Sequence, residues 1–172
     1  EDEKRTVIRI NPVMAFGTGT HPATQLCLRL LEEHIQKGTN VIDVGCGSGI
    51  LSIAAIKLGA AHVLAVDTDK QAVASTYENA EINRLSPGVL EVGQGSVNEI
   101  LADQFAIQKA PLVMVNILAN IIMKLFDQGL ADLVEEDGRL LLSGILTPQE
   151  DEVIHTAAKA GFVQVERLTE HD

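Results

Sequence analysis

The sequence is poor in basic residues. It contains 13 lysines and arginines against 24 aspartates and glutamates, which gives a formal net charge of −11. The basic residues are scattered singly, and no candidate helix carries a basic stripe. Because binding to a nucleic-acid backbone depends on clustered lysines and arginines, we expect no direct contact with nucleic acid. An acidic surface can attract a basic protein, but charge alone favours the simpler interpretation that it keeps the protein soluble.

Cysteine is also rare. Cys27 and Cys46 are the only cysteines in the sequence, and they lack the paired spacing of a zinc site. The histidines have no metal-ligand spacing with one another or with either cysteine, and two cysteines are too few for a disulfide framework. We therefore predict no metal site and a reducing, cytoplasmic setting.

Long apolar runs are absent. No run approaches the roughly 20 residues that a membrane-spanning helix needs, so we predict no membrane contact. Hydrophobic residues still make up 46% of the 172 residues, which excludes wholesale disorder and suits one ordinary domain. An initiating methionine and a signal-peptide pattern are missing too, and we expect the chain to be a piece of a longer protein.

Short apolar runs are present and alternate with helical patterns. Four runs lack the polar alternation of a half-exposed strand: residues 41–44, 62–66, 112–115 and 140–142. Continuous apolar strands are typical of a sheet that is covered on both faces. Residues 89–92 are a weaker strand candidate, and residues 162–165 are expected to form a last strand.

Helical periodicity separates these runs. It predicts a front helix over residues 23–35, with Thr20 as its cap and Pro22 in its first turn. The other expected helices cover residues 50–58, residues 72–80, residues 121 to about 137, and a segment that begins at Pro148. The alternation of strand and helix predicts a doubly wound, mostly parallel α/β domain of the Rossmann-like kind, with right-handed crossovers.

A glycine-rich turn follows the first of these strands. Residues 43–49 read Asp-Val-Gly-Cys-Gly-Ser-Gly. Gly45, Gly47 and Gly49 allow a sharp turn and a close approach of a ligand, and the following helix directs its free N–H groups into the same space. Asp67 ends the second strand, where a carboxylate can accept both hydroxyls of a ribose. Because open parallel sheets bind ligands at this end of their strands, we predict a nucleoside site.

The charge at the turn distinguishes two nucleoside cofactors. Asp43 would repel the pyrophosphate of NAD in a pocket of low dielectric constant, whereas it suits the ammonium group of S-adenosylmethionine. NAD sites also space their glycines as G-x-G-x-x-G, but this turn reads G-x-G-x-G. We therefore predict that Asp43, the three glycines and Asp67 bind S-adenosylmethionine. The alternatives are an NAD-binding domain and a cofactor-binding module without catalysis.

Three further residues are candidates for the same site. Thr24 lies in the first turn of the front helix, where a hydroxyl and unpaired N–H groups can receive a carboxylate. Asn116 ends the third apolar strand, on the rim where a substrate would meet the cofactor, although asparagine also serves as a plain strand terminator. Ser96 follows the weak strand and is a candidate contact of an adenine. His21 stands beside Pro22 in a tight loop and is interpreted as structural rather than as a base.

Three segments taken together resemble one family. They are Ala15-Phe16-Gly17-Thr18-Gly19-Thr20-His21-Pro22, the stretch 41–51, and Val115-Asn116-Ile117-Leu118-Ala119. The second segment is shared by many enzymes, but the first combined with the third is far more discriminating. Over nearly its whole length the chain is similar to the PrmA family, ribosomal-protein methyltransferases that modify large-subunit protein eleven.

This resemblance implies a fold and a set of cofactor contacts. The fold is that of class I S-adenosylmethionine-dependent methyltransferases. The contacts fall on Thr24, Gly45, Asp67 and Asn116. The chain departs from the family in having Ala23 where a first threonine is common, and this leaves the matching contact at Thr24 intact.

The resemblance also implies a domain organisation. Residues 1–10 would be the end of an interdomain linker, and residues 11–172 would form the methyltransferase catalytic domain. The separate N-terminal substrate-recognition domain is expected to be absent, as is the closing strand after Thr169.

The implied substrate is a basic, lysine-bearing ribosomal protein, methylated on lysine side chains or on its N-terminal amine. Related glutamine methyltransferases hold a planar amide with Asn-Pro-Pro-Tyr, whereas this chain has Asn116-Ile117-Leu118-Ala119, which favours an aliphatic amine. We predict that Asn116 is the catalytic residue and orients the amine while water removes its proton. Another S-adenosylmethionine-dependent methyltransferase, of small molecules or of other proteins, is the alternative.

Overall fold

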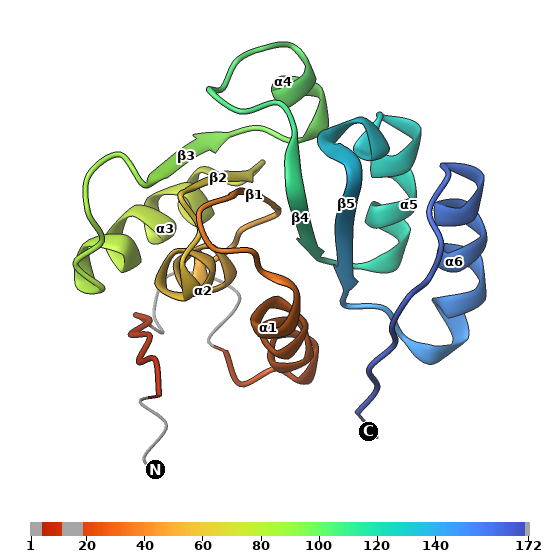
Figure 1. Ribbon diagram of the computed structural model, residues 1–172, viewed down its shortest axis with the longest axis horizontal. Helices are drawn as coiled ribbons and strands as arrows, with labels where there is room; N and C mark the ends of the chain where they lie inside the picture. The colour runs from red at the N-terminus through yellow and green to blue at the C-terminus, as the bar shows by residue number, and fades with distance from the viewer. Residues whose placement is uncertain (1–4, 12–18, 171–172) are drawn as a thin grey trace.

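The computed structural model describes residues 5–11 and 19–170, so residues 15–18 of the front loop lie outside the described part. Five strands form one sheet in the order β3-β2-β1-β4-β5, and every neighbouring pair is parallel (Figure 1). The strands are β1 (Asn40–Val44), β2 (His62–Asp67), β3 (Leu90–Gln94), β4 (Ala110–Asn116) and β5 (Val134–Ser143). The predicted doubly wound parallel α/β fold is confirmed.

Helices cover both faces of the sheet. One face carries α1 (Pro22–His34), α2 (Ile50–Leu58) and α3 (Lys70–Ile82). The other carries α4 (Val97–Leu101), α5 (Ala119–Asp127) and α6 (Glu150–Lys159), with the 3-10 helices η1 (Leu130–Leu133) and η2 (Thr147–Gln149) (Figure 1). Among the described residues, no helix combines the length and the apolar character that crossing a bilayer requires.

The three central strands β2, β1 and β4 contribute to two separate cores. Ile42, Leu64 and Val113 pack with residues of α4 and α5, whereas Val41 and Val63 pack with residues of α1 and α2. All five of these side chains are fully buried. Successive strand residues point to opposite faces, so a strand that is covered on both sides has to be apolar at every position. This confirms the prediction drawn from the continuous apolar runs.

The helix predicted from residue 121 to about 137 is wrong in its second half. Gly129 has a φ of +98°, and the chain passes from α5 through η1 directly into β5. The sheet register pairs Ala110 with Val134 and Leu112 with Arg139, which is two steps along β4 but five along β5. The apolar spacing of residues 121–133 looks helical, but pairing with β4 draws the following residues into a bulged strand instead.

The predicted last strand at residues 162–165 is also wrong. The described chain after α6, residues 161–170, forms no strand. Val163 is 83% exposed and Val165 is 76% exposed, so the alternating side chains meet no second layer. Side-chain contacts attach this tail: Glu166 forms a hydrogen bond with His34 at 2.6 Å, and Arg167 forms an ion pair with Glu150. A strand needs a neighbouring backbone to complete its hydrogen bonds, and β5 does not provide one to these residues.

The cap of the front helix differs by one residue from the prediction. His21, not Thr20, is the N-cap of α1, and its Nδ1 accepts the N–H of Ala23 at 3.2 Å. Pro22 takes the first helical position, as expected, since its fixed φ suits that position. His21 therefore has a structural role in this loop.

Candidate functional site

The turn between β1 and α2 depends on glycine. Gly45, Gly47 and Gly49 have φ angles of +78°, +55° and +78°, in the left-handed region that costs other residues about 1–2 kcal/mol each. The N–H groups of Gly45 and Cys46 donate to the carbonyl of Val66 at 2.8 and 3.0 Å. These bonds fix the turn to the end of β2 and place the N-terminus of α2 at the carboxyl edge of the sheet.

Asp67 faces this turn from the end of β2. Its Oδ2 accepts the N–H of Gly47 at 3.0 Å, and its Oδ1 accepts the N–H of Asp69 at 3.0 Å. Asp69 in turn caps α3 by accepting the N–H of Gln71 at 2.8 Å. The two backbone donors hold the Asp67 carboxylate in one orientation, and each of its oxygens keeps further capacity to accept.

Thr24 and Asn116 meet at the other end of the site. The Nδ2 of Asn116, the last residue of β4, donates to the Oγ1 of Thr24 at 3.2 Å. Thr24 lies in the first turn of α1 and is only 4% exposed. A second bond, from Ser143 Oγ to the carbonyl of Ala23 at 2.8 Å, ties the end of β5 to the same helical turn. Residues that are far apart in the sequence therefore form one polar corner.

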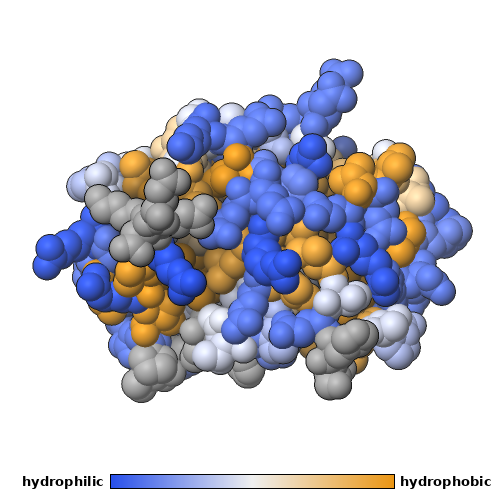
Figure 2. All heavy atoms as spheres, turned by 60° about the horizontal axis from the view of Figure 1, so that its bottom comes forward, coloured by the Kyte–Doolittle hydropathy of each residue, from blue (hydrophilic) through white to orange (hydrophobic). Residues whose placement is uncertain are grey.

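A groove of about 2060 Å³ joins these two ends. Thr24, Gly45, Gly47, Asp67 and Asn116 all line it, so five of the predicted site residues share one surface. The groove continues past β5 and α6 to the tail residues 162–170. On the face shown in Figure 2, hydrophobic side chains form separate patches between hydrophilic ones.

Asp43 does not line the groove. It is 1% exposed; its Oδ2 accepts the hydroxyl of Ser52 at 2.6 Å, and its Oδ1 has no hydrogen-bond partner among the described residues. Burial raises the pKa of this carboxyl to about 6, the Ser52 bond opposes the shift, and the charge of Asp67 adds to it. An acid with an unused acceptor therefore lies buried behind the glycine turn.

Gly49 and Ser96 also lie outside the lining of the groove. Gly49 is the N-cap of α2, and a Cβ there would lie 2.7 Å from Cγ2 of Thr76, so this position is closed by packing. Ser96 is the N-cap of α4, and its N–H donates to Glu99 at 2.8 Å. Their roles as cofactor contacts stay predictions.

Ile117 was not among the predicted site residues, although it stands in the family segment at residues 115–119. A Cβ at Gly45 would lie 2.7 Å from Cγ2 of Ile117, and a Cβ at Gly144 would overlap the carbonyl oxygen of Ile117. The loops after β1, β4 and β5 therefore pack against one another at Ile117, directly after Asn116. The lone glycine at the end of the last buried strand was the only local signal of this packing.

Thr76 is a second residue that the sequence analysis missed. Its hydroxyl donates to the carbonyl of Gly47 at 3.0 Å and lies 3.4 Å from the sulfur of Cys46. Burial is the main cause that raises the pKa of the Cys46 thiol, and it raises that of Cys27 to about 12. Both thiols are therefore packing groups rather than nucleophiles.

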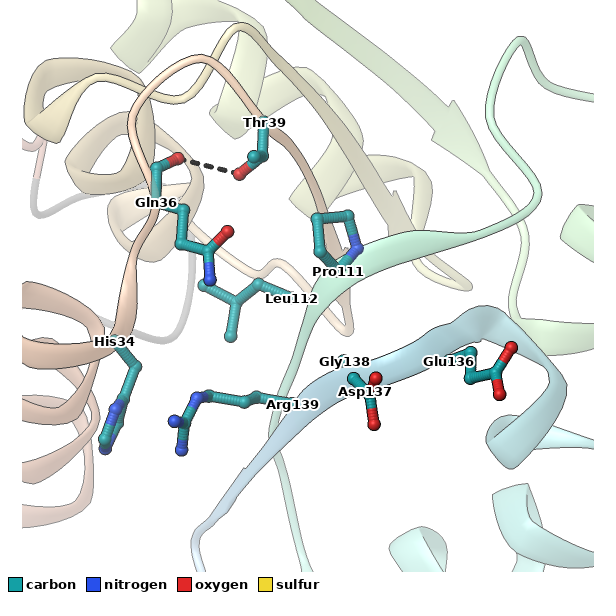
Figure 3. Close-up of a pocket in the computed structure, with 9 residues that line it drawn as sticks. All are labelled: His34, Gln36, Thr39, Pro111, Leu112, Glu136, Asp137, Gly138 and Arg139. Atoms are coloured by element: carbon teal, nitrogen blue, oxygen red, sulfur yellow. Dashed lines mark hydrogen bonds between the residues drawn. The ribbon is translucent and has the colours of Figure 1, made fainter.

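A smaller cavity of about 190 Å³ lies near the amino ends of β1 and β4, away from the glycine turn. Figure 3 shows His34 and Arg139 on one side of it and Pro111 on another. Nearby, the ligand atoms of Glu33, His34 and Glu166 lie within 4.8 Å of one another, a proximity that sequence spacing does not predict. Exposed acidic groups are common without a metal, and the prediction of no metal site stays a prediction.

The parallel sheet, the glycine turn and the groove at the carboxyl ends of the strands define the class I methyltransferase fold. A solved structure of ribosomal protein L11 methylase from Lactobacillus delbrueckii subsp. bulgaricus has a TM-score of 0.81 and 35% identity, over 99% of this chain and 86% of that one. Precorrin 8w decarboxylase from Methanobacterium thermoautotrophicum, with a TM-score of 0.70 and 20% identity over 91% of this chain and 79% of that one, shares the fold alone.

The sequence comparisons identify the family. The family model described as "Ribosomal protein L11 methyltransferase (PrmA)" matches residues 1–172. Relatives with that name from Methylococcus capsulatus and Bacillus cereus are 45% and 43% identical over 94% and 99% of this chain. The chain belongs to the ribosomal protein L11 methyltransferase (PrmA) family, which confirms the resemblance seen in the three segments. It spans about half the length, 52%, of these two relatives.

Proposed function

We propose that this chain binds S-adenosylmethionine in the groove and carries the methyl-transfer site of a protein N-methyltransferase that acts on ribosomal protein L11. One observation supports this most strongly: the Asp67 carboxylate at the glycine turn and the Thr24–Asn116 pair lie at the two ends of the same groove. The relatives carry the name of L11 as their substrate. The substrate groups would be lysine side chains or the N-terminal amine.

The residues present fit this cofactor better than a dinucleotide. Ribose hydroxyls need an acceptor, and the oriented carboxylate of Asp67 provides two oxygens. The Oδ1 of Asp43, which has no hydrogen-bond partner among residues 5–11 and 19–170, suits a positive ammonium group nearby, whereas Asp43 and Asp67 together would repel a diphosphate at the turn. Ser96, after β3, is the proposed contact of the adenine. S-adenosylmethionine would supply a methyl group on a sulfonium, whose leaving group needs no proton.

Asn116 is the proposed orienting residue for the incoming amine. Its Nδ2 donates a hydrogen bond to Thr24, and its Oδ1 can accept one from a different group. An amine must be neutral to attack, and for lysine at pH 7 this costs about 4–5 kcal/mol from a reference pKa of about 10.4. Desolvation in the groove lowers that pKa, and the proton then leaves to water. His21 is not the base, because its Nδ1 caps α1.

The first test is binding of S-adenosylhomocysteine, measured by calorimetry. We expect micromolar affinity, and a loss of about 30-fold in Asp67→Ala, because hydrogen bonds to charged groups are worth about 1.5–3 kcal/mol. The same variants are then assayed for methyl transfer to purified L11.

Asp69→Ala is the matched control for that variant. It removes the neighbouring carboxylate, which caps α3 but does not line the groove, so stability should fall by about 1 kcal/mol with affinity unchanged. Clear binding of NADH with no heat from S-adenosylhomocysteine would reverse the assignment of the cofactor.

A further inference from the structure

The segment before the front loop is held on the domain by side chains. Ile8 and Ile10 are partly buried against the core beneath α1 and α2. The backbone groups of the alternate residues 7, 9 and 11 are bonded by side chains of the helices: the Nζ of Lys57 on α2 donates to the carbonyl of Val7 at 2.6 Å. The segment forms no strand in the described part of the chain (Figure 1), and residues 5–11 are not among those that line the groove.

Asn79 on α3 and Asn83, the C-cap residue of that helix, hold the next backbone groups. The Oδ1 of Asn83 accepts the N–H of Arg9 at 3.0 Å, and its Nδ2 donates to the Arg9 carbonyl at 2.6 Å. The Oδ1 of Asn79 accepts the N–H of Asn11 at 2.8 Å. Residues four apart lie on one face of a helix, so the two side-chain amides bind residues 9 and 11 as an adjacent strand would.

Asn79 has a second contact that Asn83 lacks. Its Nδ2 donates to the carbonyl of Ser48 at 2.8 Å, inside the glycine turn. Asn79 is fully buried, and the backbone carbonyl of Asn79 also accepts the Nδ2 of Asn83 at 2.7 Å. One planar amide thus joins the segment at residue 11 to the turn at residue 48.

We propose that Asn79 is a positioning residue for the glycine turn, and that it couples docking of residues 7–11 to cofactor binding. The inference rests on the proposed function, because it takes the turn to be the cofactor site. If the segment undocks, Asn79 loses the partner of its Oδ1 and its amide plane is no longer fixed, so the turn loses a bond that holds its carbonyl. Any such coupling is reciprocal: what the segment does to cofactor affinity, the cofactor does to the segment.

The test is amide hydrogen exchange with and without saturating S-adenosylhomocysteine. The N–H groups of Arg9 and Asn11 should exchange about tenfold more slowly with the ligand, a coupling of ordinary size. The control is the N–H of Ala102, bonded to Asn98 at the end of α4, which reports only general stabilisation. It should slow less than the two segment amides.

Variants then separate the two contacts. Asn79→Ala should weaken binding of S-adenosylhomocysteine about tenfold, the effect of losing a buried hydrogen-bond partner, and abolish the response of the Asn11 amide to the ligand. Asn83→Ala removes the clamp on residue 9 and the bond to the Asn79 carbonyl but leaves the Asn79 side-chain bonds in place, so affinity should fall less than about threefold and the Asn11 amide should still respond. A residue with a purely structural role would change stability without changing the affinity for S-adenosylhomocysteine.

The outcomes are distinct. Absence of ligand binding in the wild-type protein contradicts the proposed function and, with it, this inference. Binding with no extra protection at residues 9 and 11 overturns the inference alone, and this measurement needs no variant, so it decides even if Asn79→Ala does not fold. Wild-type affinity in Asn79→Ala would overturn it as well.

Discussion

The stability advantage of Asp43→Asn over the wild type is expected to grow by about 2 kcal/mol as the pH rises from about 4.5 to about 8. The carboxyl of Asp43 is fully buried, and burial raises its pKa from 3.8 to about 6. Above pH 6 the folded protein has to hold a buried charge, which is stabilised by hydrogen bonds from Ser52. An asparagine of nearly the same shape removes that charge.

The sign follows from the two pKa values. Below about pH 4 the carboxyl is protonated in the folded and in the unfolded state, and it costs nothing. Between pH 4 and pH 6 the folded protein binds the proton and the unfolded chain does not, so the stability of the wild type falls as the pH rises. Above pH 6 the full cost of about 3 kcal/mol is present, since each pKa unit corresponds to about 1.4 kcal/mol.

Urea unfolding of both proteins across this pH range measures the effect. Ser52→Ala is the companion variant and should have the opposite sign, because losing its hydrogen bond costs more when Asp43 is charged. A constant difference between wild type and Asp43→Asn at all pH values would show that the carboxyl has an ordinary pKa.

If the ammonium of the cofactor lies near Asp43, the variant should also bind S-adenosylhomocysteine more weakly at pH 8, although it is more stable there.

The second large effect is expected for Gly144→Ala. Gly144 has a φ of +82°, and a Cβ there would overlap the carbonyl oxygen of Ile117 and lie 3.0 Å from its carbonyl carbon. The neighbour is backbone, which cannot move aside as a flexible side chain can. We expect a loss of about 3 kcal/mol in unfolding free energy, from backbone strain and overpacking together. Displacing Ile117 also displaces Asn116, so methyl transfer should fall by about 100-fold.

Gly88→Ala is the matched control for this prediction. Gly88 has a φ of +83°, and a Cβ there would have no atom within 4 Å, so this variant measures the cost of the backbone conformation alone. It should lose about 1 kcal/mol and leave methyl transfer unchanged. Equal losses in the two variants would mean that the contact at Ile117 carries no energy.

The layers of the fold and part of the site could be predicted from local patterns. Continuous apolar runs specify buried parallel strands because both faces of such a sheet are covered. The glycines at 45, 47 and 49 and the acid at the end of the next strand identify the turn and Asp67, since strand ends of a parallel sheet meet at one edge. The strands, the glycine turn and Asp67 could be predicted because each depends on residues that lie close together in the sequence.

Features that depend on distant neighbours could not be predicted in this way. The bulge of β5 follows from its pairing with β4, and residues 162–165 alternate like a strand but have no backbone to pair with. The bond between Thr24 and Asn116 joins residues 92 positions apart; both were predicted as site residues, but nothing in the sequence indicated the bond between them. Asparagine has a weak helix propensity. No local pattern indicates a role for Asn79, because its partners lie at residues 11 and 48.

A structure with bound S-adenosylhomocysteine is the most direct test of the central claim, that the groove holds this cofactor between Asp67 and the Thr24–Asn116 pair. We expect the ribose hydroxyls on the Asp67 carboxylate, and the amino-acid end of the ligand between the glycine turn and Thr24. An empty groove in crystals soaked with the ligand, or a dinucleotide with its phosphates on the glycine turn, would contradict it.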